Sequence, residues 1–483
     1  MTRELTWRNV SLHSRAKFLE ARWQKLCALY LPRAAEDSMW RYDIGPRGQQ
    51  PSSGWKLHIS ATILNAPGVL RKVAPFLVAH GVSFKAPRSL LEVGQLNSGL
   101  DYNYSQIGKI ITVYPRSNDE AVFLAQRLHK LTRRISAPVV PFDLRFSDSS
   151  NVYYRFGAFE HLKLTGNGQK VPAIQAPNGT LVPDIRERPK PDWVADPFAA
   201  HKPKSRSEKQ KAVSSIRVVK VLAQRGKGGV YKAVDSSSGR ARLCLLKEGR
   251  KNGELSWDGR DGAWRVRNEK RVLDSLAACV VPVPRVHSSF EIDGNYYLVM
   301  DYLDGDTLHQ VLLSLRRRLS LPRVLDYGLQ LAKFMSQMHG AGWVWRDCKP
   351  KNIIVTREGQ LVPIDFEGAA LIHRPDPLQW STPTFTSPEP RDHKVRNGVA
   401  DDLYALGSVL FLLLTGRLYD PARPLTIQKL RRNIPPKLCE LVEALLAGEP
   451  EGRPSGNAVR ATLNSILLNS KQQQMSLGHV KAT

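Results

Sequence analysis

A chain of 483 residues is too long for one hydrophobic core and predicts two to four domains. Its hydrophobic content of 42% is that of a globular protein, and no run approaches the roughly 18 apolar residues of a membrane-spanning helix, so we expect no membrane association. The net charge of +27 fits either a solvated surface or attraction to polyanions, but no zinc-finger or RNA-binding signature accompanies it, so nucleic acid is not the expected partner.

The first 185 residues mix short strand-like runs with two helical stretches, which predicts an α+β domain over residues 1–185. In Gly54-Trp-Lys-Leu-His-Ile-Ser, polar and apolar residues alternate, so Lys56 and His58 share one face of a strand. Lys85 ends a second strand-like run. Further basic residues occur at strand-like positions: Lys109, Arg145 and Arg155.

Basic residues on neighbouring strands are compatible with two kinds of chemistry. Lysine and arginine can bind a phosphate group. Alternatively, a lysine near other cations has a lowered pKa and can abstract a proton. Unrelated surface charges would give the same pattern, and spacing alone leaves these alternatives open.

Residues 186–213 are rich in proline and charge, which predicts a linker. Strands and then long amphipathic helices follow. This order predicts a small β-rich lobe over residues 214–303 and a helical lobe over residues 304–468. The polar segment 469–483 predicts a disordered tail.

The predicted small lobe contains several candidate nucleotide-binding residues. Glycines allow backbone N–H groups to approach phosphates closely, and a glycine-rich turn between two strands contains Gly226, Gly228 and Gly229. An apolar strand then ends at Lys247, the position of a lysine that grips nucleotide phosphates, and Glu269 on the next helix is its candidate partner. The strand from Tyr296 fits a hinge that reads an adenine edge, with candidate contacts Met300 and Tyr302.

The helical lobe begins with residues suited to phosphoryl transfer. Arg346-Asp-Cys-Lys-Pro-Lys-Asn provides the carboxylate of Asp347 for the acceptor hydroxyl, together with Lys349 and Asn352. Ile364-Asp-Phe-Glu follows and provides Asp365. Asn352 and Asp365 are the candidate metal ligands, at protein-kinase spacing.

In this order the motifs resemble the eukaryotic-type protein kinase fold over about residues 214–468. The resemblance implies ATP or GTP, Mg²⁺ and a structural ion pair between Glu389 and Arg453. The chain departs from the kinase pattern in its glycine-rich turn, where the usual first two glycines fall on other residues. It departs again at Trp345, which replaces the His of His-Arg-Asp, and at Glu367, which replaces the Gly of Asp-Phe-Gly. Loss of that Gly predicts a metal loop less prone to flip, and because Asp365 is intact we expect an active kinase.

Both halves also resemble class III lanthipeptide synthetases. The matching segments are Gly54-Trp-Lys-Leu-His-Ile-Ser-Ala-Thr, Gly81-Val-Ser-Phe-Lys, Leu96-Asn-Ser, Gly108-Lys-Ile-Ile-Thr-Val-Tyr-Pro, Tyr154-Arg-Phe-Gly-Ala-Phe, Lys227-Gly-Gly-Val-Tyr, Leu246-Lys-Glu and Ile364-Asp-Phe-Glu. In that family the kinase phosphorylates Ser/Thr of a precursor peptide, and a domain akin to phosphothreonine lyases eliminates the phosphate. The resemblance implies that Lys85 is the base and His58 the acid, and that Lys56, Arg145 and Arg155 hold the phosphate.

The family continues into a cyclase domain for which this chain has no room, so a separate cyclase is a candidate partner. The expected function is therefore a Ser/Thr dehydratase that combines kinase and lyase steps. The alternatives are a cytosolic signalling Ser/Thr kinase with a non-catalytic N-terminal binding domain, and a non-catalytic scaffold. Five scattered cysteines and the lack of a signal peptide favour the cytoplasm.

Overall fold

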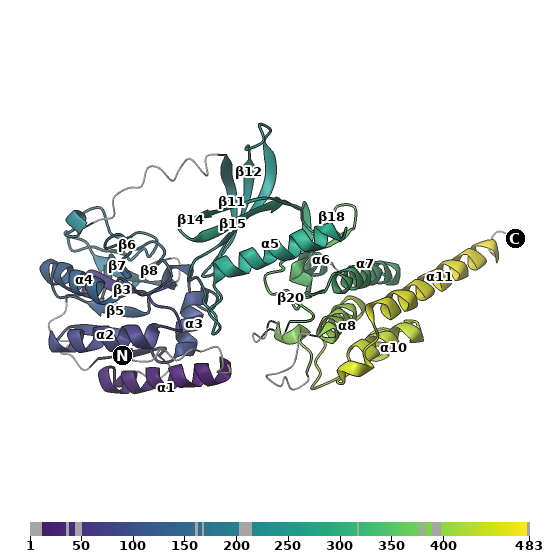
Figure 1. Ribbon diagram of the computed structural model, residues 1–483, viewed down its shortest axis with the longest axis horizontal. Coiled ribbons are helices and arrows are strands. Elements are labelled where there is room, and N and C mark those ends of the chain that lie inside the picture. Colours follow the sequence, from purple (N-terminus) through teal and green to yellow (C-terminus); the bar gives the residue numbers. More distant parts are fainter. Residues whose placement is uncertain are drawn as a thin grey trace. The chain divides into compact units, whose positions relative to one another are not determined.

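The computed structural model describes residues 12–34, 38–43, 51–159, 163–166, 169–201, 215–315, 318–374, 376, 380, 382–388 and 398–480. The architecture is mixed α and β, which confirms the predicted fold class (Figure 1). The chain divides into two compact units. The first contains residues 1–242, 246–264 and 290–297, and the second contains residues 243–245, 265–289 and 298–483.

A seven-stranded antiparallel sheet forms the centre of the N-terminal domain, with strand order β1-β2-β4-β5-β3-β7-β6. Its strands are β1 (Arg33–Ala34), β2 (Trp40–Tyr42), β3 (Ser53–Ile59), β4 (Ser83–Pro87), β5 (Ile111–Tyr114), β6 (Leu144–Arg145) and β7 (Val152–Ala158). The domain's helices are α1 (Leu12–Tyr30), α2 (Ala66–Ala79), α3 (Leu90–Ser98) and α4 (Asn118–Thr132). A separate small sheet follows, with strands β8 (Lys163–Gly166), β9 (Gln169–Gln175) and β10 (Leu181–Pro183).

Local sequence determines where the helices begin and end. Ser89 caps α3 by accepting a hydrogen bond from the backbone of Glu92, and Gly99 ends the helix in the left-handed conformation. Ser117 caps α4 in the same way, and acidic residues in the first turn suit the positive end of the helix dipole.

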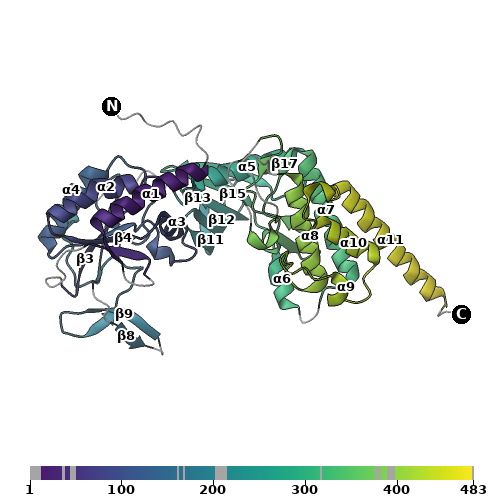
Figure 2. The same ribbon diagram turned by 90° about the horizontal axis from the view of Figure 1, so that it is seen from below.

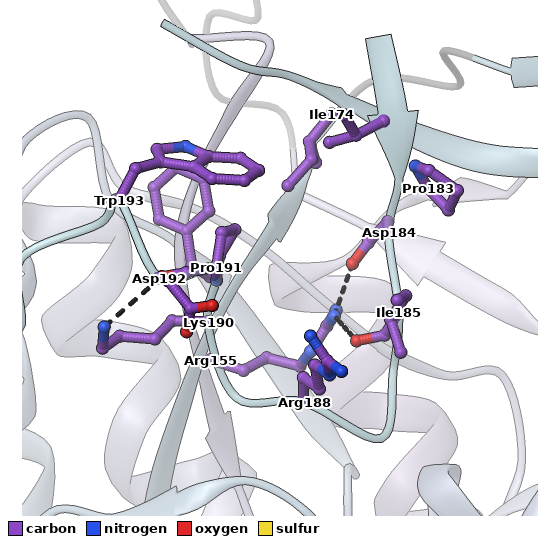
Figure 3. A pocket seen from close by; sticks show the side chains of 12 residues that line it. Arg155, Ile174, Pro183, Asp184, Ile185, Arg188, Lys190, Pro191, Asp192 and Trp193 are labelled. Carbon is purple, nitrogen blue, oxygen red and sulfur yellow. Dashed lines mark hydrogen bonds and ion pairs between the residues drawn. The ribbon is translucent and has the colours of Figure 1, made fainter.

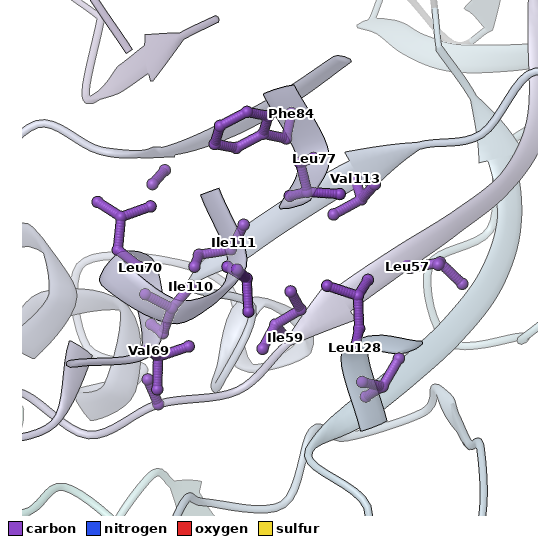
Figure 4. Close-up of a cluster of buried hydrophobic side chains, with 14 of the residues drawn as sticks. Leu57, Ile59, Val69, Leu70, Leu77, Phe84, Ile110, Ile111, Val113 and Leu128 are labelled. Atoms are coloured by element: carbon purple, nitrogen blue, oxygen red, sulfur yellow. The ribbon is translucent and has the colours of Figure 1, made fainter. Parts of the chain in front are cut away.

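The apolar face of the sheet is covered by α2 and α4, and α1 packs against α2 (Figures 1 and 2). Alternate strand residues point to this face and meet apolar helix residues. Figure 4 shows the centre of this core, which includes Leu57, Ile59, Val69, Leu70, Leu77, Phe84, Ile110, Ile111, Val113 and Leu128.

The opposite face of the same strands carries polar residues in one row. Direct cross-strand partners run from Lys85 to Thr112, His58, Tyr153 and Arg145. Lys56 pairs with Arg155 in the next row on this face. Since directly opposed residues project to the same side, the register gathers the predicted lysines, histidine and arginines on one face.

Part of the segment predicted as a linker packs on this domain. Phe198 is fully buried, and its ring lies 4.0 Å from the ring of Tyr154 and 5.5 Å from that of Trp55 between centroids. The prediction of a linker over 186–213 therefore needs correction here, because composition does not reveal that an aromatic residue completes the core.

The kinase half begins with a five-stranded sheet of order β11-β12-β13-β15-β14. Its strands are β11 (Ile216–Arg225), β12 (Gly228–Asp235), β13 (Arg242–Gly249), β14 (Val286–Ile292) and β15 (Asn295–Asp301). Two smaller sheets contain β16 (Gly305–Thr307), β18 (Ile353–Thr356) and β19 (Leu361–Pro363), and β17 (Trp343–Val344) with β20 (Ala370–Leu371). Its helices are α5 (Gly262–Ala278), α6 (Leu308–Ser314), α7 (Leu321–Gly340), α8 (Val399–Thr415), α9 (Ile427–Leu430), α10 (Pro436–Leu445) and α11 (Gly456–Val480).

Helix α8 packs against α7 and α10, and α11 packs against α7. Buried Asp402 on α8 accepts hydrogen bonds from the backbone of Trp345 and Arg346, at 2.8 and 2.7 Å, and so positions the segment that precedes Asp347. Helix α11 extends to Val480, into the segment 469–483 predicted to be a disordered tail. Among the described helices, none is both long and apolar enough to cross a bilayer.

The aromatic centre of the N-terminal core gives a test of stability. Trp55 is buried and packs edge-on against Tyr154, Phe156 and Phe198. We expect Trp55→Ala to lower the free energy of unfolding of this domain by about 3–5 kcal/mol, because it leaves a large cavity. Denaturant unfolding measures the loss. Leu91→Ala, at a residue that is 70% exposed, is the control, and an equal loss in both variants would contradict the packing described.

Candidate active sites

A buried charge network lies on the polar face of the seven-stranded sheet. Asp143 Oδ2 lies 2.6 Å from His58 Nδ1, and its Oδ1 accepts a hydrogen bond from Lys109 Nζ at 2.7 Å. Burial would raise the pKa of Asp143, but the charges of His58 and Lys109 and their hydrogen bonds lower it to about 2. Asp143 is therefore ionised and orients the ring of His58.

His58 itself is neutral in this network near pH 7. Burial lowers its pKa to about 4, and the positive charges of Lys109 and Lys56 act in the same direction, against the opposing effect of Asp143. With Asp143 ionised, the proton of the neutral ring lies on Nδ1, which donates to the carboxylate. Nε2 is then left as an acceptor.

Two lysines beside this network have lowered pKa values. Burial lowers the pKa of Lys56 to about 7, and Arg155, Lys85 and Arg186 add to the effect, while Asp184 opposes it. Burial, with the charge of Arg186, lowers the pKa of Lys85 to about 8. A substantial fraction of each lysine is therefore neutral at a mildly alkaline pH.

Aromatic rings form the surroundings of Lys85. Its Nζ lies 4.2 Å from the ring centroid of Trp40 and 5.9 Å from that of Tyr42, both on β2. These rings exclude water from the amine, which favours its neutral form, while their faces attract the cation.

The two predicted phosphate-binding arginines have different surroundings. Arg155 forms a buried ion pair with Asp184 and donates to the carbonyl of Ile185 at 3.3 Å. Arg145 donates to the carbonyl of Ser150 at 2.7 Å and lies over the ring of Tyr153, two strands away from His58. The structure thus brings Lys56, His58, Lys85 and Arg155 together, while Arg145 lies at the margin and its role remains a prediction.

In the kinase half, Asp347 is held by three side chains. Lys349 Nζ donates to both of its carboxylate oxygens at 2.8 Å, and Asn352 Nδ2 donates to Oδ2 at 2.8 Å. The hydroxyl of Thr382 donates to Oδ1 at 3.0 Å and accepts from Lys349 at 2.9 Å. Burial and the nearby charge of Asp365 raise the pKa of Asp347, against the effect of Lys349.

Three carboxylates gather near the predicted metal site. Ligand atoms of Glu269, Asp365 and Glu367 lie within 4.8 Å of one another, and hard oxygen ligands of this kind suit Mg²⁺. Asn352 donates through its nitrogen to Asp347, which leaves its Oδ1 as the acceptor that a metal ligand requires. These residues fit the divalent metal that a kinase requires, with Asp365 and Asn352 as the predicted ligands.

Trp345, in the place of the kinase histidine, has a structural role. Its ring is fully buried against Phe334 and Phe366, with centroids 5.5 and 5.8 Å away. Its indole N–H donates to the carbonyl of Asp365 at 3.3 Å, where the backbone has a positive φ of 65°. The tryptophan thereby supports the backbone of the predicted metal ligand.

The predicted nucleotide-binding residues lie on the expected strands and turn. Lys247 is buried on β13 and Met300 is buried on β15, with Tyr302 just after that strand. Lys247 and Glu269 belong to different compact units, so their ion pair remains a prediction. Arg453 donates to carbonyls of Ala400 and Ala447, whereas its predicted partner Glu389 lies outside the described residues.

The glycine-rich turn has an additional constraint that the sequence does not reveal. The N–H of Gly226 donates to the carbonyl of Ser98 at 2.9 Å, at the end of α3. A Cβ at Gly226 would lie 1.6 Å from the carbonyl oxygen of Asn97, which no side chain tolerates. Gly226 is therefore required for contact with the N-terminal domain, while phosphate binding by Gly226, Gly228 and Gly229 stays a prediction.

The sequence patterns did not identify Asp143, Asp184 or Arg186. They also did not predict that Glu367 lies beside Glu269. Asp143 and Arg186 lie in turns, outside the alternating patterns that reveal strand faces. The run Phe142-Asp-Leu-Arg directs attention to Arg145, and only the fold shows that its acidic residue reaches both Lys109 and His58.

Residues 217–464, more than half of the chain, match the family described as "Protein kinase domain". The chain belongs to the protein kinase family. Such a domain implies the use of ATP and a divalent metal. Residues 31–210 match "RamC, N-terminal domain", so this domain precedes a kinase domain, as the resemblance to class III lanthipeptide synthetases predicts.

Similarity to individual proteins agrees with these matches. The chain is 32% identical to "Probable SapB synthase" of Streptomyces coelicolor, over 76% of this chain and 40% of that protein. It is 28% identical to "Serine/threonine-protein kinase F" of Synechocystis, over 51% of this chain and 54% of that protein. It is 29% identical to "Serine/threonine-protein kinase PknA" of Mycobacterium tuberculosis, over 51% of this chain and 60% of that protein. The chain thus spans between 40% and 60% of the length of these relatives.

The hydroxyl of Thr382 is expected to support catalysis by the kinase. Because it hydrogen-bonds both Asp347 and Lys349, we expect Thr382→Val, which keeps the shape but removes the hydroxyl, to lower kcat for phosphate transfer to a Ser/Thr peptide about tenfold. Thr382→Ser should retain most of the rate. Equal rates for the Val and Ser variants would show that the hydroxyl is not needed.

The lowered pKa of Lys85 is directly measurable. An amine-selective reagent modifies only the neutral lysine, so we expect the rate of Lys85 modification to reach half its maximum at about pH 8. Peptide mapping across a pH series locates the modified residue, and Lys85→Arg should remove that signal. A midpoint near the ordinary value of 10.5 would contradict the proposed environment.

Proposed function

We propose that this protein dehydrates Ser and Thr residues of a precursor peptide in two steps, phosphorylation in the kinase domain and phosphate elimination in the N-terminal domain. The main observation behind the proposal is on the polar face of the N-terminal sheet, where two lysines of lowered pKa lie beside the buried Asp143–His58 pair. The same chain also contains Asp347 hydrogen-bonded to Lys349 and Asn352, the residues expected of a kinase loop. The matches to "RamC, N-terminal domain" and to "Probable SapB synthase" accord with the resemblance to class III lanthipeptide synthetases, which implies a precursor peptide as substrate.

In the first step, ATP with its divalent metal, for which we propose Mg²⁺, supplies the phosphoryl group. Asp347 faces the acceptor hydroxyl and accepts its proton as the oxygen attacks the γ-phosphorus, while the bond from that phosphorus to the β,γ-bridging oxygen breaks and ADP leaves. Lys349 and Thr382 fix the orientation of that carboxylate, while Asn352 and Asp365 would hold the metal. Whether GTP replaces ATP depends on the hinge around Met300 and Tyr302.

In the second step, neutral Lys85 removes the Cα proton of the phosphorylated residue. The electron pair of that C–H bond forms the Cα=Cβ double bond, the Cβ–O bond breaks, and phosphate departs. Lys56 and Arg155 stabilise the phosphate, since lysine and arginine are strong donors to its oxygens. The products are dehydroalanine from Ser and dehydrobutyrine from Thr.

His58 can act as the acid only after substrate binds. Its ring is neutral near pH 7 in the network described above. A phosphate dianion beside Nε2 raises the pKa of His58, because an opposite charge favours the protonated ring. Protonated His58 then donates to the bridging oxygen as the Cβ–O bond breaks, and Asp143 stabilises the imidazolium.

Intact mass of a Ser/Thr peptide, incubated with the protein, ATP and Mg²⁺, tests the proposal. We expect loss of one water per modified residue, through a phosphorylated intermediate. Lys85→Ala should accumulate phosphopeptide, with elimination slowed about 10²–10⁴-fold, because a general base is missing. Asp347→Asn should leave the peptide unmodified, yet still eliminate phosphate from a synthetic phosphopeptide.

Other outcomes of the same experiment would favour the alternative functions. Phosphate gain that never becomes water loss in the wild type would favour the alternative function, a cytosolic signalling kinase with a non-catalytic N-terminal domain. No change in mass would favour a scaffold. A dehydrated but uncyclised product would fit either a separate cyclase or a final product without rings.

A further inference from the structure

The segment 184–193, here called the strap, lies along the edge of β7 beyond the end of β6. Backbone hydrogen bonds hold it in place: Phe156 N–H donates to Pro189 O at 2.8 Å, and Asp184 N–H donates to Pro172 O at 2.8 Å. Asp184 also accepts from Ala158 N–H at 3.2 Å and pairs with Arg155. The strap is therefore part of the wall beside Arg155, although its composition predicts a linker.

Arg186 lies in the strap and affects three lysines of the polar sheet face. It directly follows Asp184 and Ile185, both of which contact the guanidinium of Arg155, so the strap carries Arg186 beside this face. In agreement with that position, its charge lowers the pKa of Lys56, Lys85 and Lys109, each after the larger effect of burial. Arg186 is exposed, and among the described residues no hydrogen bond or ion pair holds its side chain. The three lysines and the exposed guanidinium of Arg186 together favour the binding of a multiply charged anion.

Residues of the strap also line a pocket of about 180 Å³ (Figure 3). Arg155 and the ring of Trp193 both line it, and Arg155 is the cross-strand partner of Lys56, so the pocket adjoins the polar face of the sheet. Its apolar lining residues are Phe156, Ile174, Val182, Pro183, Ile185, Pro191 and Trp193, and its charged ones are Arg155, Asp184, Arg188, Lys190 and Asp192. A concave apolar space of this size has room for one side chain.

We propose that the strap is the substrate-binding wall of the lyase centre, with Arg186 binding the phosphate and the pocket holding an apolar side chain next to the phosphorylated residue. This inference rests on the proposed function, since it concerns the same centre. The occupant is a phosphopeptide because Arg155 both lines the pocket and pairs across the strands with Lys56 of the cationic face, which joins the two sites. Inorganic phosphate would use only the cationic side.

Arg186 has a further consequence for the reaction. A bound phosphate dianion attracts protons and would raise the pKa of Lys85, which would then lose its capacity as a base. The positive charge of Arg186 opposes that rise, because it lies near both the lysine and the proposed phosphate. Arg186 thus binds the phosphate and keeps Lys85 partly neutral in the complex.

Binding can be measured without any turnover. The probes are fluorescent peptides in which a phosphonate, with CH₂ in place of the bridging oxygen, cannot be eliminated, and which carry either Leu or Ala beside the phosphonate residue. With the full-length protein, we expect Arg186→Ala to weaken binding of both peptides about 10-fold to 100-fold. Arg186→Lys should recover part of the loss. Arg71→Ala, at an exposed arginine on α2, should bind as the wild type does.

The pocket predicts a different pattern. We expect the wild type to bind the Leu peptide about tenfold more tightly than the Ala peptide, and Trp193→Ala to abolish this preference while inorganic phosphate competes equally well in both proteins. Trp193→Phe should retain most of it.

Either of two results would overturn the inference: equal binding by the Arg186→Ala and Arg71→Ala variants, or a Leu preference that is absent from the wild type or unchanged in Trp193→Ala. Elimination from the corresponding phosphoserine peptides, assayed separately, decides the proposed function. Tight, strap-dependent binding without elimination would leave the strap site standing and refute the lyase activity.

Discussion

The register of β4, β5, β3 and β7 determines which side chains of the N-terminal domain enter the apolar core and which lie on the polar face of the sheet. Each strand residue that faces the helices is flanked by residues that face the other side, so a slip of one residue would exchange Leu57 and Ile59 for Lys56 and His58 in the core. The free energy of burying the apolar set therefore also fixes the polar set. Lys85, on a strand that is separated from β3 by β5, reaches the same face through the same register.

This arrangement gathers cations, and the fold supplies few anions to balance them. Asp143 and Asp184 each serve two or more positive groups, and both have pKa values below the ordinary one despite burial. The lysines respond in the opposite direction, since burial and like charges favour their neutral form. Burial contributes most to the lowered pKa of Lys85, and the neighbouring positive charge adds to it. In the proposed function, the same positive charge would attract the phosphate, so basicity and substrate affinity would share one electrostatic feature.

Sequence patterns predicted the residues that lie on regular elements. The alternation around Lys56 and His58 identified a strand face, and the spacing from Asp347 to Asn352 identified a kinase loop, which the structure shows as a hydrogen-bonded set. Residues in turns and in the strap were not predicted, because no local sequence pattern distinguishes a functional turn residue from a solvent-exposed one. Asp143 and buried Phe198 meet their partners only where the chain returns to the sheet, and the role proposed for Arg186 depends on the same return.

The unusual glycine-rich turn follows from strand pairing. Strand β11 pairs with β12 as far as Arg225 opposite Gly228, so only Gly226 and Lys227 remain for the turn. Ala223 and Arg225, where the kinase pattern has its first two glycines, both lie within the paired strand, opposite Val230 and Gly228. Gly226 is retained because of the close carbonyl of Asn97. The side chain of Asn97 in turn accepts from Gly108 N–H at 3.1 Å, next to Lys109, so the tip of the kinase turn and the Asp143 network share one supporting residue.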